Sequence, residues 1–287
     1  MSETDLRSSY AWCEAVARKA ARHFYPAFRL LPRAQRRAMC ALYAFMRLTD
    51  DLADEPGDLP TKRGNLLRWR EQLHDCFAGR FSHALHPALH DAIKRFSIPI
   101  GYLDDVIDGV EMDLNPVRFE SFAQLYDYCH LVASAVGLAC IHIWGFSHDD
   151  AKKPADAAGI ALQLTNSIRD LGEDRAAGRV YLPSEDLNRF GCSVEQLGCV
   201  GEPAYRELMA FEVERARSYY AAAESLSQYL TRTGRAVFQV MLSTYRGILD
   251  EIERRGYDVL SSPIRIGRWT KLRLALKALP VRWGLAL

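Results

Sequence analysis

The chain has 287 residues, and 49% of them are hydrophobic, which excludes a disordered or fibrous protein. Its 37 Lys and Arg nearly balance its 36 Asp and Glu, and this near-zero net charge argues against broad nucleic-acid binding. Seven scattered cysteines form no Cys-x-x-Cys pair, and the polar start of the chain does not resemble a secretory signal. We therefore expect a cytoplasmic protein whose cysteines stay reduced.

Helical periodicity dominates the sequence. Apolar residues recur at a spacing of three to four along almost the whole chain, whereas alternating strand-like runs are hard to find. Pro and Gly residues divide this pattern into segments, and no linker or repeat separates one part from another. The pattern predicts a single all-α domain over residues 1–287. The expected helices are 8–24, 33–55, 60–78, 84–96, 100–113, 119–146, 151–177, 203–231 and 233–255, followed by a tail helix.

Two segments raise the question of a membrane. The uncharged stretch Leu131–Phe146 is about 16 residues long, short of the roughly 20 that a membrane-spanning helix needs, so we expect a buried core helix. The tail, residues 265–287, alternates Arg and Lys with Trp and Leu. A basic amphipathic segment of this kind can lie on an anionic bilayer, which would place the protein peripherally on the inner face of the membrane. A closing helix packed on the body explains the tail equally well.

The first acidic motif stands near the end of the helix expected at 33–55. Asp50 and Asp54 are four residues apart, so their side chains share one helix face roughly 6 Å apart, while Asp51 points elsewhere. Two like charges near a helix C-terminus are unfavourable unless a cation lies between them. Arg47, one turn earlier, could contact a phosphate group.

The second acidic motif places Asn166, Asp170 and Asp174 in one stripe, beside Gln163 and Arg169. Carboxylate and amide oxygens suit a hard cation such as Mg²⁺, and Mn²⁺ is the alternative. Such a cation also binds the phosphate oxygens of a substrate. A lone Asp-x-x-x-Asp pair is common on helix surfaces. Two matched stripes on largely buried helices favour a metal-assisted diphosphate site.

Other polar motifs compete with this interpretation. The acidic stretch 104–113 lacks Arg and Asn partners, so we expect helix-surface charge or a supporting role. Glu71-x-x-His74 and Asp127-x-x-His130 resemble the carboxylate–His spacing of di-iron bundles, but only one of them is a true Glu-x-x-His motif. Surface or core histidines are therefore preferred.

Four segments carry a resemblance to a known family: Leu42–Asp54, with its Tyr-Ala-Phe-Met-Arg-Leu-Thr-Asp-Asp sequence, Tyr128–Gly137, Gln163–Asp174 and Gly178–Pro183. The chain resembles the squalene/phytoene synthase family from about residue 23 to 257, and looks most similar to bacterial presqualene diphosphate and squalene synthases of hopanoid biosynthesis. The resemblance implies a single-domain isoprenoid-synthase helical bundle with a central cavity.

The resemblance also implies a reaction. It is the head-to-head condensation of two farnesyl diphosphates to presqualene diphosphate, continuing to squalene or hydroxysqualene in some members. The alternative is a phytoene synthase acting on two geranylgeranyl diphosphates. Mg²⁺ is the implied cofactor, and NADPH is needed only if the reaction proceeds to squalene.

Residue roles follow from position in the family motifs. The implied metal ligands are Asp50, Asp51, Asp54, Asn166, Asp170 and Asp174. The implied catalytic residues are Tyr43, Arg47, Tyr128, Arg169 and Tyr245. The implied substrate-binding residues are Arg22, His23, Phe24, Arg47, Gln163, Asn166, Arg169 and Tyr181. The usual Ser-x-Ser-Phe of the family is replaced here by Ala21-Arg22-His23-Phe24, which removes two hydroxyls beside the diphosphate.

Rival classes remain at this point. A non-catalytic helical membrane adaptor would explain the helices and the tail but gives no reason for two acidic stripes. A head-to-tail prenyltransferase or a terpene cyclase would share the fold class and an Asp-Asp-x-x-Asp pattern. The expected partners are prenyl diphosphates and, through the tail, membrane lipids; nucleic acid is not expected, and the sequence does not predict an oligomeric state.

Overall fold

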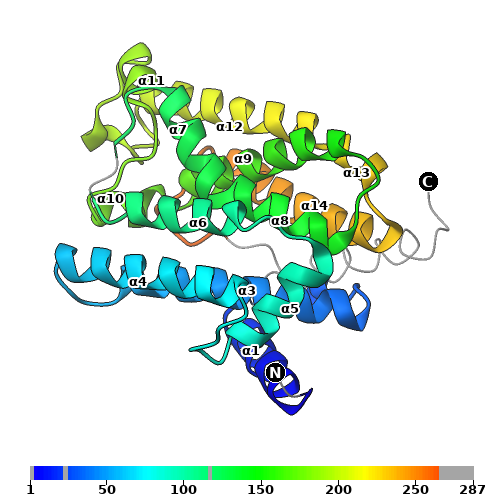
Figure 1. Ribbon diagram of the computed structural model, residues 1–287. Coiled ribbons are helices and arrows are strands. Elements are labelled where there is room, and N and C mark those ends of the chain that lie inside the picture. The colour runs from blue at the N-terminus through cyan, green and yellow to red at the C-terminus, as the bar shows by residue number, and fades with distance from the viewer. Residues whose placement is uncertain (1–2, 22–24, 116–117, 265–287) are drawn as a thin grey trace.

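The computed structural model describes residues 3–21, 25–115 and 118–264, and the described chain is helical with no β-strand beyond two isolated bridges. The all-α prediction is confirmed (Figure 1). The predictions for Arg22, His23 and Phe24 and for the basic tail lie outside the described residues.

The longer helices of the described residues match the predicted ones in order. They are α1 Glu3–Ala20, α3 Arg33–Asp54, α4 Leu59–Phe77, α5 His86–Phe96, α6 Gly101–Met112, α7 Phe122–Cys129, α8 Ala135–Trp144, α9 Lys152–Arg169, α12 Pro203–Ala223 and α14 Arg232–Arg254. The short ones are α2 Tyr25–Phe28, η1 His130–Ser134, η2 Asp149–Ala151, α10 Leu171–Ala176, α11 Ser184–Arg189, η3 Val194–Gln196 and α13 Leu226–Tyr229.

The helices form two groups around one hydrophobic core. Helices α1, α3, α4 and α5 pack together, and Figure 1 shows them in blue to cyan below the other helices. Helix α9 packs against α8, α12 and α14 in the second group, while α6 and α8 contact both α3 and the second group. In this arrangement the last turns of α3 and of α9 both border the interior of the protein.

The predicted helix 119–146 is divided by a π-helical turn, η1, between α7 and α8. Two glycines make room for this turn. A Cβ on Gly159 of α9 would lie 2.4 Å from the Cα of Ser134, and a Cβ on Gly109 of α6 would lie 2.6 Å from the side chain of Val132. A regular helix was expected because periodicity does not reveal one extra residue per turn.

The segment Phe122–Trp144 is long and apolar enough to cross a membrane, but more than half of its most apolar window is buried inside the protein. It packs against α6 and α9, as the interpretation of Leu131–Phe146 as a core helix requires. Its hydrophobicity is therefore explained by packing.

Two other predicted helices are shorter in the structure. The segment 151–177 is divided at Asp170, between α9 and α10, and the segment 203–231 ends at Ala223 before the short α13. These differences arise because the local turns leave the helical pattern of apolar residues nearly unchanged.

A buried ion triad attaches α11 to α12. Arg215 donates to Asp186 at 2.7 Å and to Glu212 at 2.8 Å, and its guanidinium lies 4.2 Å from the centroid of the Phe122 ring at the start of α7. Burial raises the pKa of Glu212 to about 7, although Arg215 opposes this shift. The triad therefore joins α7, α11 and α12, and the charge of Arg215 affects the pKa of Glu212.

We expect Gly159→Ala to lower the free energy of unfolding by about 1–3 kcal/mol, because the new methyl group meets the backbone of η1, which cannot simply rotate away. Thermal or urea unfolding measures this. Gly64→Ala in α4 is the matched control, since its Cβ would meet only the flexible end of Arg68 at 3.6 Å. The control should stabilise the protein by about 0.5–1 kcal/mol. Equal effects of the two substitutions would contradict the close approach of α9 and η1.

We expect Arg215→Met to destabilise the protein by about 3–5 kcal/mol at pH 8, since it leaves two carboxylates buried without a counter-charge. The loss should be smaller at pH 5. At pH 5, below the folded-state pKa of about 7, Glu212 is protonated with or without Arg215. Above that pKa the wild type pairs the ionised Glu212 with Arg215 and the variant cannot, so the loss grows as pH rises through about 7. Urea unfolding at both pH values tests this, and a loss independent of pH would contradict it.

Candidate active site

The interior contains two adjoining cavities that share four lining residues: Val132, Val136, Gln163 and Met241. The cavity beside α3 and α6 has a volume of about 330 Å³, and the cavity between α8, α9 and α14 has a volume of about 190 Å³. The central cavity implied by the resemblance is therefore present.

The smaller cavity is apolar over most of its wall. Its aliphatic and aromatic lining includes Ile141, Trp144, Leu162, Leu226, Phe238 and Leu242. Polar side chains occur at Gln163, Asn166 and Tyr245. A hydrocarbon chain fits such a wall, with its polar end toward these three residues.

The larger cavity has an acidic side. Asp50 and Asp113 line it together with Tyr43 and Tyr128. The Asp50 side chain is exposed to water in the open cavity, but many protein atoms surround that cavity, and this partial desolvation raises the pKa of Asp50 to about 7. A group of this kind gains from a cation that would stabilise its charged form.

The end of α3 is held in place by a buried hydrogen-bond chain. Trp69 of α4 donates its indole N–H to the Thr49 hydroxyl at 2.9 Å, and Thr49 donates to the backbone carbonyl of Phe45 at 2.9 Å. The acidic residues follow directly. Asp51 forms an ion pair with Arg47, whereas Asp50 faces the cavity and Asp54 lies exposed at the helix end.

The second motif lies where α9 ends. The backbone N–H of Asp170 donates to the carbonyl of Asn166 at 2.8 Å, and that of Asp174 to the carbonyl of Asp170 at 2.9 Å. The four-residue spacing therefore persists through the break at Asp170. Arg169 donates to the Asp170 carboxylate at 2.7 Å, so this arginine, like Arg47, is paired with a neighbouring acid.

Two groups in this motif stand out electrostatically. The Oδ1 atom of Asn166 is buried and has no hydrogen-bond partner, while its Nδ2 donates to Gln163 at 3.3 Å. Desolvation raises the pKa of Asp174 to about 6, although Arg179 lies 3.4 Å from its carboxylate. Both groups would be stabilised by a cation.

Asp113 is the residue that sequence reasoning underrated. It follows α6 directly and accepts hydrogen bonds from Tyr128 at 2.9 Å and from Tyr181 at 3.0 Å. The two tyrosine rings stack with centroids 5.3 Å apart. Desolvation raises the pKa of Asp113, and its charge acts on Asp50 and Asp174. Of the two predictions for the stretch 104–113, helix-surface charge is therefore wrong for Asp113, whereas a supporting role agrees with its contacts.

Arg179 is the second such residue. Its Nη2 contacts Asp174, and its Nε is buried without a hydrogen-bond partner. The available signal was its place beside Tyr181 in the Gly178–Pro183 segment, which carries part of the resemblance. A donor in this position could bind a phosphate oxygen.

The described candidate residues gather around the cavities. Tyr43, Asp50, Tyr128, Gln163, Asn166 and Tyr245 line them. Tyr181 donates a hydrogen bond to Asp113, whose charge also acts on Asp174. Tyr245 interacts with Arg169 and Asn166. The first motif thus reaches the cavities through Asp50 and the second through Gln163 and Asn166, whereas Asp54, Asp170 and Asp174 do not line either cavity.

The donor set can be tested against a metal ion. Within the described residues no three His, Cys, Asp or Glu side chains lie close enough together to hold a metal. The unpartnered Oδ1 of Asn166 and the desolvated carboxylates of Asp50 and Asp174 nevertheless fit a hard divalent cation. Because few protein ligands are near one point, substrate phosphate oxygens would have to complete the coordination.

The histidines of the competing motifs have ordinary partners. His74 contacts Asp104 at 3.1 Å, and His130 contacts Asp156 at 2.6 Å. Neither lies among the residues lining the two cavities. The di-iron interpretation gains no support from them.

Comparison with known proteins gives the family. The squalene/phytoene synthase family model matches residues 17–270. The chain is 38% identical to a phytoene synthase of Arthrospira platensis, covering 92% of this chain and 90% of the relative. It is 36% identical to a 15-cis-phytoene synthase of Synechococcus elongatus, covering 93% and 91%.

A solved structure agrees with this assignment. The crystal structure of a dehydrosqualene synthase in complex with ligand superimposes with a TM-score of 0.87 at 26% sequence identity, and the match covers 96% of each chain. The isoprenoid-synthase fold is thereby shown, and a non-catalytic adaptor is disfavoured. The chain belongs to the squalene/phytoene synthase family, whose members are head-to-head prenyltransferases.

Proposed function

We propose that this protein condenses two geranylgeranyl diphosphates head to head into prephytoene diphosphate and then phytoene. The observation that carries the diphosphate chemistry is the acidic wall of Asp50 and Asp113 beside an apolar cavity, and the head-to-head class follows from the family. The substrate rests on similarity: identity to phytoene synthases is 38% and 36%, against 26% to the dehydrosqualene synthase. These values favour the geranylgeranyl alternative over the farnesyl substrate expected from the sequence.

The diphosphates would bind at the two acidic motifs. We propose that Asp50, Asp54, Asn166, Asp170 and Asp174 hold Mg²⁺, which would supply Lewis-acid stabilisation of the departing diphosphate. Asp51 is the exception among the expected ligands, since Arg47 already pairs with it. Arg47 and Arg169 would exchange their neighbouring carboxylates for phosphate oxygens when substrate binds.

The chemistry then needs a dry cavity. Breaking the C1–O bond of the first substrate leaves an allylic cation, and the bonding pair leaves with the diphosphate. The C2–C3 double bond of the second chain attacks C1 of this cation, which moves the positive charge to C3 of the second chain. Loss of a proton from C1 of the first chain then supplies the electron pair that closes the cyclopropane ring. Apolar side chains exclude water from such a cation, and aromatic faces stabilise it.

The tyrosines have distinct roles in this proposal. Tyr128 is buried and its hydroxyl donates to Asp113, and desolvation keeps its pKa well above the ordinary value. It therefore stays neutral and presents its ring, not a phenolate, to the cavity. Tyr43 and Tyr245 would line the path of the cation, since both face the cavities.

The last step of the reaction determines whether NADPH is needed as a second cofactor. Ionisation of the cyclopropyl intermediate, rearrangement and loss of a proton give phytoene without any reductant. Reduction of that final cation by a hydride would give a squalene-type product. We therefore propose a reaction independent of NADPH.

We expect Asp50→Asn and Asp170→Asn each to lower kcat by about 10²–10³-fold, because each removes charge that stabilises the departing diphosphate through the bound cation. Steady-state assays with Mg²⁺ measure this. Asp108→Asn, an exposed residue of α6 that pairs with Arg70, is the matched control and should keep full activity. Folded Asp50 and Asp170 variants with normal activity would overturn the proposed site.

We expect incubation with Mg²⁺ and geranylgeranyl diphosphate to yield phytoene, with the same yield with or without NADPH. Mass spectrometry of the extracted products checks this. A higher kcat/KM for farnesyl diphosphate, with presqualene diphosphate, squalene or hydroxysqualene as product, would reverse the substrate assignment. Absence of a coupled product from either substrate would contradict the proposed activity altogether.

A further inference from the structure

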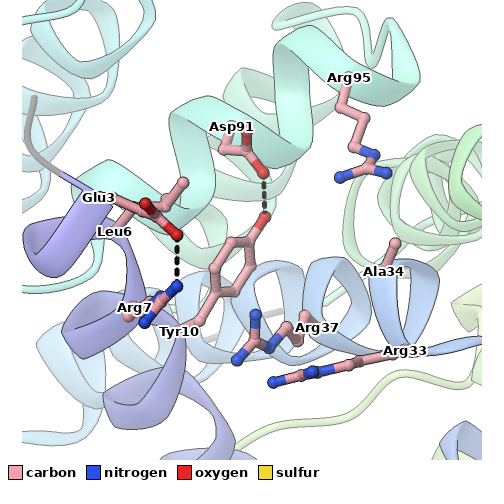
Figure 2. Close-up of a pocket in the computed structure, with 9 residues that line it drawn as sticks. All are labelled: Glu3, Leu6, Arg7, Tyr10, Arg33, Ala34, Arg37, Asp91 and Arg95. Atoms are coloured by element: carbon pink, nitrogen blue, oxygen red, sulfur yellow. Dashed lines mark hydrogen bonds and ion pairs between the residues drawn. The ribbon is translucent and has the colours of Figure 1, made fainter.

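A third cavity lies where α1, α3 and α5 meet, beside the first residues of α3 and not beside its acidic end (Figure 2). Its volume is about 660 Å³. It is lined by Glu3, Leu6, Arg7, Tyr10, Arg33, Ala34, Arg37, Asp91 and Arg95. Nothing in the proposed reaction uses these residues.

The cavity has an excess of positive charge. Of its two carboxylates, Glu3 pairs with Arg7, and Asp91 accepts a hydrogen bond from the Tyr10 hydroxyl at 2.6 Å. Arg33, Arg37 and Arg95 have no carboxylate partner in the part of the chain that the structure describes. Arg33 and Arg95 are exposed and Arg37 is half-buried, so three guanidinium groups face one open space that an anion could enter.

Tyr10 gives the cavity a rigid floor. Its side chain is buried, and the guanidinium of Arg37 lies 5.4 Å from the centroid of its ring. Burial together with Asp91 raises the pKa of Tyr10, so the residue stays neutral and its hydroxyl stays bound to Asp91. Figure 2 shows Arg33, Arg37 and Arg95 around the space beside this ring.

The backbone adds to the positive potential. Arg33 and Ala34 are the first two residues of α3, a 22-residue helix whose preceding residue, Pro32, provides no side-chain cap. The first N–H groups of such a helix carry partial positive charge at the cavity. This contribution supports the arginines and would not make a site without them.

The position is separate from the diphosphate site. Arg33 and Asp50 are 17 residues apart on the same helix, which corresponds to about 25 Å at 1.5 Å per residue. A ligand in this cavity therefore cannot contact the reacting atoms. Any role it has concerns regulation or location of the protein.

We propose that the cavity between α1, α3 and α5 binds a phosphate group, with Arg33, Arg37 and Arg95 as its ligands. Guanidinium groups bind phosphate oxygens in pairs of parallel hydrogen bonds, and three of them match the multiple oxygens of a phosphomonoester or diphosphate. The volume exceeds that of a single ion, so there is room for the group to which the phosphate is attached. The same chemistry is found in free diphosphate and in a phosphatidic acid headgroup.

The test uses the full-length protein and two probes. Calorimetry with inorganic pyrophosphate in EDTA measures binding without the cation that the acidic motifs need. Cosedimentation with phosphatidylcholine vesicles, with and without phosphatidic acid, measures headgroup binding. The variant is the double substitution Arg33→Gln and Arg95→Gln. The control, Arg206→Gln with Arg232→Gln, removes the same charge from exposed residues at the starts of α12 and α14.

We expect the cavity variant to lose at least tenfold in affinity for one of the two probes, while the control variant binds as the wild type does. A loss for pyrophosphate assigns a soluble phosphate ligand, and a loss for phosphatidic acid vesicles alone assigns a lipid headgroup. Wild-type protein that binds neither probe, or a cavity variant that binds both unchanged, would overturn the proposal. Circular dichroism and the melting temperature of both variants establish that they are folded.

Discussion

The protonation of the carboxylates at the candidate site depends on two opposing effects: burial favours the neutral form, and nearby positive charge favours the ionised form. Asp50, Asp113 and Asp174 all lie where protein replaces much of their water, and desolvation raises the pKa of each. Asp50 and Asp113 line one cavity, and the cavity that adjoins it has a wall that is mostly aliphatic and aromatic. A site that must bind diphosphate at one end and protect a carbocation at the other requires this juxtaposition, because the first task needs charge and the second excludes water. The helices around it hold the two environments within one interior.

At Asp113, hydrogen bonds from two tyrosines stabilise the partly buried carboxylate. Tyr128 comes from α7 and Tyr181 from the segment after α10, and both donate to the same carboxylate. Asp113 is therefore fixed by two hydroxyls rather than by a nearby arginine. The charge of Arg179 lowers the pKa of Asp113, although the ion pair of Arg179 is with Asp174. The arrangement joins three segments that are distant in the sequence.

The sequence predicted the features that local spacing controls. The helices carrying Asp50 and Asn166 follow from periodicity, and the pairing of Asp51 with Arg47 agrees with its expected direction away from Asp50. The position of Asp113 could not be predicted this way, because its partners lie 15 and 68 residues later in the chain. The same limit applies to the cavity at Arg33 and Arg95, because the packing of α1 and α5 on α3 creates it.

The π-helical turn has a consequence for how the length of this segment can vary. Each residue of a helix turns the chain by about 100°, so one residue removed from the turn would rotate α8 against α7 by that angle. Val132 and Val136 now line both cavities, on the two sides of the junction between η1 and α8. A shortened turn would point them in directions that no longer agree, and Trp144 at the end of α8 would leave the wall with them. The number of residues here is therefore as constrained as their chemical type, even where substitutions are tolerated.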